Sequence, residues 1–406
     1  MRVRCHWLLV LTVLASSPAW AKKVNLDYHV RLLPQSEQAE VRLTLGDGEA
    51  VHSLDFDLGK EGAYSDFKAD GQWLMQGDGL RGKWQPSAGK SELTYRVRLA
   101  HHLGNGNYES RMTADWALFR GDDLVPPARL DQQDGTELVS RLSFDLPTGW
   151  RSVETPWPRI GKQRFRIDNV SRLFDRPTGW MIAGKVGTRR ARLGETEVSV
   201  AAPQGQGMRR LDNLTLLTFV WPQLTAVFPR NPPKLLLVGA RDQLWRGTRA
   251  GHNSIYLHSS RPLVNENGSS PLLREVVHVF AQINDRQGSD WIGESINEYY
   301  AIELLRRAGG IADDRYQALQ GGLERRSAKV TSLKGDQVDG AVTARGVLLL
   351  QALDREIRVH THNQRSLDDV ARALMRLNSV STQEFIHLSE SVLGRESEVL
   401  SSKLLR

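Results

Sequence analysis

A short stretch around residue 275 carries side chains that a zinc site on a helix would use. Two histidines four positions apart share one face of a helix, so both can reach one zinc ion. The glutamate after the first histidine can then take a proton from the zinc-bound water. Glu275 and His278 stand where this glutamate and the second histidine belong, but Arg274 stands in place of the first histidine. The stretch therefore offers a base and one ligand.

A second segment with matching chemistry follows at residues 290–301, which read Asp-Trp-Ile-Gly-Glu-Ser-Ile-Asn-Glu-Tyr-Tyr-Ala. Its two glutamates, Glu294 and Glu298, are one helical turn apart. Together the two segments resemble the catalytic helices of gluzincin aminopeptidases, the superfamily of aminopeptidase N, and in particular its glycyl aminopeptidase branch. The resemblance covers roughly residues 250–395.

The resemblance implies a role for each of these side chains. Glu275 matches the general base, His278 the second zinc ligand and Glu294 the third, with Glu298 as the alternative third ligand. The spacing from His278 to Glu294 is shorter than is usual in aminopeptidase N, which predicts a trimmed loop between two helices.

Several departures from the family pattern indicate a degenerate zinc site. Arg274 cannot bind zinc, because a protonated guanidinium has no lone pair to offer. Catalytic zinc needs three protein ligands and a water, and only two ligands remain. Thr343 stands where the family has a tyrosine that stabilises the oxyanion of the transition state, and the Gly-x-Met-Glu-Asn strand motif is absent. We expect Arg274 to replace the ion by pairing with Glu294 or Glu275.

These observations favour a pseudopeptidase that binds no cofactor and recognises a peptide or an envelope protein. The alternative is an active zinc-dependent aminopeptidase or metallopeptidase with an unorthodox ligand set of His278, Glu294 and His258. A third possibility is a purely structural envelope protein whose cleft is vestigial. The loop at residues 265–268 is expected to lie near the cleft, where a role in peptide binding is open.

The elements that position these residues follow from the periodicity of the chain. Up to about residue 200, apolar and polar residues alternate as in half-buried strands, with glycine-rich turns between the runs. After Pro203 two short buried strands are expected at residues 234–239 and 254–258. From Pro271 onward the pattern is mainly helical, with Ser270, Ser366 and Ser381 as helix caps. The expected fold class is α+β: an N-terminal antiparallel β-sandwich at residues 22–202, then a thermolysin-like, mainly helical peptidase-type domain at 203–406.

The N-terminus predicts the compartment. Arg2 and Arg4, an apolar run and a small-x-small site ending at Ala21 are typical of a signal peptide. Cleavage near Ala21 would leave a periplasmic or secreted protein without a stable membrane anchor. It would also remove Cys5, the single cysteine of the chain, and with it any disulfide or thiolate site. The arginines are scattered despite a formal charge of +7, so no nucleic-acid partner is expected.

Overall fold

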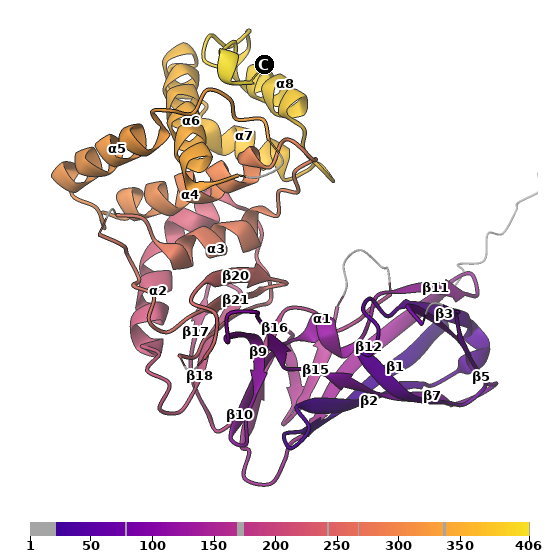
Figure 1. Ribbon diagram of the computed structural model, residues 1–406. Helices are drawn as coiled ribbons and strands as arrows, with labels where there is room; N and C mark the ends of the chain where they lie inside the picture. Colours follow the sequence, from indigo (N-terminus) through magenta and orange to yellow (C-terminus); the bar gives the residue numbers. More distant parts are fainter. Residues whose placement is uncertain are drawn as a thin grey trace, which may run out of the picture.

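The computed structural model describes residues 22–77, 79–168, 174–241, 243–266, 268–335 and 338–405. The predicted signal peptide at residues 1–21 lies outside these ranges. In the described part of the chain, a β-rich first half is followed by a second half in which helices cover one sheet (Figure 1). No helix among the described residues is both long and apolar enough to cross a bilayer.

The first half is built on a seven-stranded sheet with the order β14-β15-β12-β1-β2-β7-β4. Every second residue of β1 is buried, as the alternating sequence predicts. The strands are β1 (Lys22–Leu33), β2 (Gln38–Leu45), β4 (Tyr64–Ala69), β7 (Ser91–Arg98), β12 (Thr136–Asp145), β14 (Arg159–Gly161) and β15 (Arg164–Ile167).

Two smaller sheets complete the described part of the first half, in the orders β11-β3-β6-β5 and β13-β16-β10-β9-β8. Their strands are β3 (Val51–Asp57), β5 (Gln72–Met75), β6 (Arg81–Gln85), β8 (His101–His102), β9 (Tyr108–Met112), β10 (Trp116–Arg120), β11 (Ala128–Gln132), β13 (Ser152–Glu154) and β16 (Trp180–Gly184). Two short helices, η1 (Gly48–Ala50) and α1 (Gly121–Leu124), join strands of this half.

One strand pair departs from the antiparallel arrangement we expected. β1 pairs with β2 antiparallel, but it pairs with β12 in parallel, with Val30 opposite Phe144. Parallel neighbours need a long crossover connection, which the strands between β2 and β11 supply. An alternation of apolar and polar residues is the same in both pairings, so the sequence pattern cannot distinguish them.

The second half contains a five-stranded sheet with the order β17-β18-β19-β21-β20. β18, β19 and β21 are parallel, and β17 and β20 are antiparallel strands at its two edges. The strands are β17 (Val186–Leu193), β18 (Thr196–Pro203), β19 (Lys234–Val238), β20 (Thr248–Gly251) and β21 (Ser254–Leu257). β17 and β18, which the sequence analysis placed in the first domain, thus belong to the sheet of the second half. The local alternation of a strand does not reveal that its partner lies beyond a helix.

Helices cover this sheet and extend away from it (Figure 1). They are α2 (Arg210–Val227), α3 (Pro271–Ala281), α4 (Trp291–Arg307), α5 (Asp313–Ser327), α6 (Gly340–His360), α7 (Leu367–Leu374), α8 (Thr382–Leu393) and η2 (Lys403–Leu405). α2 was not predicted, because Pro222 lies inside it and the apolar Leu211 and Phe219 are exposed. Its apolar residues therefore do not mark a single face.

The predicted helix caps are confirmed. The Ser270 hydroxyl accepts a hydrogen bond from the Leu273 amide, and Pro271 occupies the first turn of α3. Ser366 and Ser381 each form a capping box at the start of α7 and α8. α4 ends just before Gly309, whose φ of 80° few other residues adopt. Local sequence thus determines where α3, α7 and α8 begin and where α4 ends.

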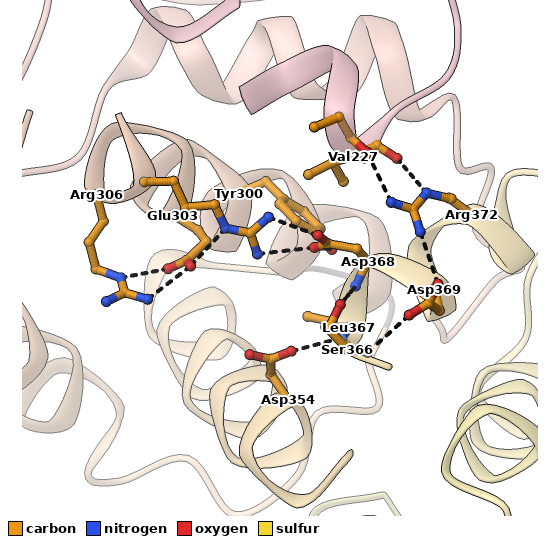
Figure 2. Close-up of polar contacts among 12 residues, drawn as sticks. Val227, Tyr300, Glu303, Arg306, Asp354, Ser366, Leu367, Asp368, Asp369 and Arg372 are labelled. Atoms are coloured by element: carbon orange, nitrogen blue, oxygen red, sulfur yellow. Dashed lines mark hydrogen bonds and ion pairs between the residues drawn. The ribbon is translucent and has the colours of Figure 1, made fainter. Parts of the chain in front are cut away.

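A charged network fixes the start of α7 against α4 (Figure 2). The carboxylate of Asp368 accepts hydrogen bonds from the Arg307 guanidinium at 2.8 and 3.1 Å and from the Tyr300 hydroxyl at 2.9 Å. Arg372, one turn further along α7, donates to the carbonyl oxygens of Ala226 and Val227 at the end of α2. These bonds satisfy helix-terminal carbonyls that have no partner within α2.

A buried ion cluster joins the two halves. The Glu154 side chain of β13 is fully buried, and it pairs with Lys234 of β19 at 3.3 Å and Arg159 at 3.2 Å. Arg190 of β17 contacts the same carboxylate. Lys234 is 1% exposed and also lies 3.5 Å from Glu197 of β18. The cluster therefore ties strands of the first half to three strands of the second sheet.

α4 and α6 approach each other at a glycine. A Cβ atom added at Gly346 of α6 would lie 1.9 Å from the Ser295 Oγ and 2.8 Å from its Cβ in α4. Since contacts under 3.0 Å force a shift, only glycine fits at this position.

We predict that Gly346→Ala lowers the free energy of unfolding by about 1–3 kcal/mol, because overpacking pushes the two helices apart. Gly322→Ala is the matched control: it lies inside α5, where an added Cβ meets nothing within 4 Å, and it should gain up to about 1 kcal/mol from helix propensity. Urea denaturation measures both. A Gly346→Ala protein as stable as wild type would refute the close approach.

Candidate functional site

The predicted site lies where α3 and α4 face each other across the edge of the second sheet. An Arg274 Nη of α3 donates to the Glu294 Oε2 of α4, and both side chains are about half-buried. The pairing that the sequence predicted for Arg274 is confirmed with Glu294. The positive group that replaces the first histidine thus holds the residue expected to be the third zinc ligand.

Glu275, the predicted base, is bound to the sheet instead of facing Arg274. One carboxylate oxygen accepts from the Thr248 hydroxyl at 3.0 Å, and the other accepts from the Ala250 amide at 2.7 Å. Both donors belong to the edge strand β20. Glu275 therefore links α3 to this strand with both oxygens.

His278 lies one turn further along α3 and has different neighbours. Its Nδ1 is 3.2 Å from the Asn297 side-chain amide, and its ring is exposed. It lines a cavity of about 500 Å³ together with His252 and Gln282. The His252 ring in turn stacks on Trp157 at 4.5 Å, and burial lowers its pKa to about 4.

The residues of this region do not fit a zinc ion. Within the described ranges, no three His, Cys, Asp or Glu side chains lie close enough together to hold a metal. Arg274 occupies the first position and engages Glu294, so His278 and Glu294 are left without a third ligand. We therefore assign no chemical step to a metal in this structure.

The unorthodox ligand set that included His258 is wrong. The His258 ring is 2.9 Å from the Arg241 carbonyl oxygen through Nε2 and 2.7 Å from the Ser260 hydroxyl through Nδ1. It lines a separate cavity with Arg241 and Arg246. His258 follows β21, and β20 lies outside β21 at the edge that α3 contacts. The neighbouring strand therefore separates His258 from the cleft.

Charges at the site are balanced by arginine. Burial works to lower the pKa of Arg274, but the carboxylates of Glu294, Glu275 and Glu298 outweigh it and raise that pKa. Burial raises the pKa of Glu298, and Arg274 and Arg326 act in the opposite direction. Glu298, the alternative ligand, thus lies in the field of two arginines.

Thr343, in the place of the family's tyrosine, is also engaged within the protein. Its hydroxyl donates at 3.0 Å to the carbonyl oxygen of Asp339, the N-cap residue of α6, and its side chain is largely buried. A hydroxyl proton used in this way is not directed at an oxyanion. Thr343 nevertheless lines one cavity with Arg274 and Glu298.

Asp285 is a positioning residue that the sequence analysis missed. Its carboxyl group accepts from the Gly293 amide at 3.0 and 3.2 Å, in the first turn of α4. Burial raises its pKa to about 7, and the charges of Asp290 and Glu294 add to the effect. The N-cap position itself is Asp290, whose side chain makes no cap. The unsatisfied amides at the start of α4 were the signal for such a partner.

Comparison with solved structures shows which fold this is. The chain superposes on an aminopeptidase N family protein from Idiomarina loihiensis with a TM-score of 0.64 and 14% identity, covering 92% of this chain and 72% of the other. It also matches an M1 zinc metallopeptidase variant from Deinococcus radiodurans bound to a Tyr-Ser-Ala substrate, with a TM-score of 0.59 and 15% identity over 94% and 92% of the two chains.

The same Deinococcus radiodurans peptidase without that substrate gives a TM-score of 0.56 at 15% identity. No protein-family model and no curated protein matches the sequence. At such low identity the likeness concerns the fold alone. The chain therefore has the two-part fold of M1 zinc metallopeptidases, as the helical motifs predicted.

The raised pKa of Asp285 predicts a pH-dependent stability. With a folded pKa of about 7 and an unfolded value near 3.9, the native state binds more protons between these limits. The contribution of Asp285 to the free energy of unfolding therefore falls as the pH rises from about 4 to about 7. We expect Asp285→Asn to gain roughly 2–3 kcal/mol relative to wild type on going from pH 5 to pH 8.

Urea unfolding of both proteins at the two pH values measures this difference. The comparison is its own control, because simple loss of a hydrogen bond would change stability by the same amount at both pH values. A difference that does not vary with pH would contradict the assignment.

Proposed function

We propose that this protein is a pseudopeptidase, a protein with a metallopeptidase fold that binds peptides or an envelope partner without zinc and without hydrolysis. The observation that carries the proposal is the ion pair between Arg274 and Glu294. A guanidinium that binds a carboxylate neutralises its charge and satisfies its oxygens, as a bound metal ion would.

Two further contacts support the absence of hydrolysis. A general base must be within reach of the proton it removes, and both oxygens of Glu275 accept hydrogen bonds from strand β20. An oxyanion needs donors aimed at it, and the Thr343 hydroxyl donates to its own helix. The groups that would supply base, metal and oxyanion donor are thus all engaged or replaced.

Two cavities beside α3 support the proposed binding of peptides. A cavity of about 250 Å³ lies beside Arg274, and one of about 500 Å³ lies beside His278 on the same helix. Structures of the same fold are described with Tyr-Ser-Ala, L-tryptophan and L-arginine bound. The transfer of peptide binding to this chain is an analogy of fold. The signal-peptide pattern at residues 1–21 supports an extracytoplasmic site of action.

Zinc content tests the inactive site. We expect the mature wild-type protein to contain far less than one zinc per chain, since two ligands are too few for a catalytic site. Arg274→His restores the third ligand and should bring zinc close to one equivalent. Elemental mass spectrometry measures both proteins. Neither should hydrolyse aminoacyl substrates, because Thr343 still lacks a free donor.

Arg274→Lys is the matched control, because it keeps the positive charge without adding a ligand and should stay free of zinc. One equivalent of zinc in the wild-type protein, lost on His278→Ala, would overturn the proposal and restore the enzyme hypothesis.

A further inference from the structure

We propose that the cavity beside Arg274 binds a free carboxylate group, from the C-terminus or an acidic side chain of a peptide. The inference rests on the proposed peptide binding and names the chemical group that the cleft recognises. It follows from the charges that line the cavity and from what each charge already contacts.

Three arginines line this cavity, and they come from three separate segments. Arg261 lies before α3, Arg274 lies on α3, and Arg326 lies at the end of α5. Among its described lining residues, Glu298 is the single acid. Three guanidinium groups, of which that of Arg274 is already paired with Glu294, therefore share about 250 Å³ of space with one carboxylate.

The arginines retain unused donors. Arg274 engages Glu294, and Arg261 donates through its Nε to the Arg246 carbonyl oxygen at 3.0 Å. Within the described residues Arg326 forms no hydrogen bond or ion pair, although it is close enough to Glu298 to lower the pKa of that carboxyl group. A guanidinium offers five N–H donors in a fork that matches a carboxylate. Arg326 and the remaining donors of Arg261 can therefore bind an anion.

The acids of the cleft are not free to bind an amine. Glu294 is held by Arg274, and Glu275 is held by Thr248 and Ala250. Glu298 faces two arginines. An amino terminus would thus meet carboxylates whose charge is already matched, whereas a carboxylate would meet an excess of positive charge. The polarity of the site therefore favours the acidic end of a peptide.

The wall of the cavity is fixed before any ligand arrives. The Arg315 guanidinium donates to the carbonyl oxygens of Asn265 and Glu266, and the Asn265 side-chain amide donates to the Ser269 hydroxyl at 3.0 Å. Asn265 and Ser269 both line the cavity. A volume of about 250 Å³ is below the roughly 300–1,000 Å³ of sites for drug-sized ligands. The cavity thus suits one terminal residue or one acidic side chain.

Calorimetric titration of the full mature protein tests the inference. The probes are tetra-alanine with a free carboxyl terminus, tetra-alanine amide, a tetrapeptide amide with one glutamate, and succinate alone. We expect tetra-alanine to bind at least tenfold more tightly than its amide. Arg326→Ala should remove that preference. Arg325→Ala is the matched control, because this neighbouring exposed arginine does not line the cavity, and it should bind like wild type.

The probes separate the possible results. Tighter binding of the glutamate peptide than of tetra-alanine, lost in Arg326→Ala, would support the inference and identify an acidic side chain as the source. Equal binding of tetra-alanine, its amide and the glutamate peptide would overturn the carboxylate inference and leave peptide binding intact. Binding of succinate through Arg326, with no peptide bound, would support the carboxylate site and overturn the proposed function. No binding of any probe would overturn both.

Discussion

The ion pair between Arg274 and Glu294 is the contact on which the rest of the site depends. Two glutamates one turn apart on α4 face α3, and a carboxylate in such a place needs a counter-charge or must take up a proton. In a zinc peptidase the ion supplies that charge. Here the Arg274 side chain supplies it, so the contact between the two helices is encoded in the chain itself. Glu275 is then free to join α3 to the sheet edge, and Glu298 remains in a cavity lined by arginines.

The helical part of this arrangement could be predicted from sequence because its determinants are local. Ser270 and Pro271 fix the start of α3, and the spacing of the two motifs places Arg274 opposite Glu294. The sequence limited the partner of Arg274 to two glutamates, Glu294 and Glu275. Only the fold decides between them, because Glu275 accepts hydrogen bonds from a strand more than twenty residues earlier in the chain and is therefore not the partner of Arg274. The His258 assignment failed for the same reason, since the order of strands in the sheet separates that ring from the cleft.

Other features lay beyond local pattern. The parallel pairing of β1 with β12 and the membership of β17 and β18 in the second sheet depend on partners far along the chain. α2 has apolar residues on more than one side, so no periodicity marked it. The role of Asp285 depends on the turn that brings it to the start of α4. Similarity at 14–15% identity shows how freely sequence varies under this fold, which is why the residues of the site, and not the fold, carry the functional argument.

The buried cluster around Glu154 and Lys234 has a mechanical consequence. Separating the two halves would break the ion pair between Lys234 and Glu154, whose side chains have almost no access to water. A buried charge that has lost its partner is costly. The junction therefore holds the two halves rigidly together and does not act as a hinge. The two halves should therefore lose their structure in one cooperative event.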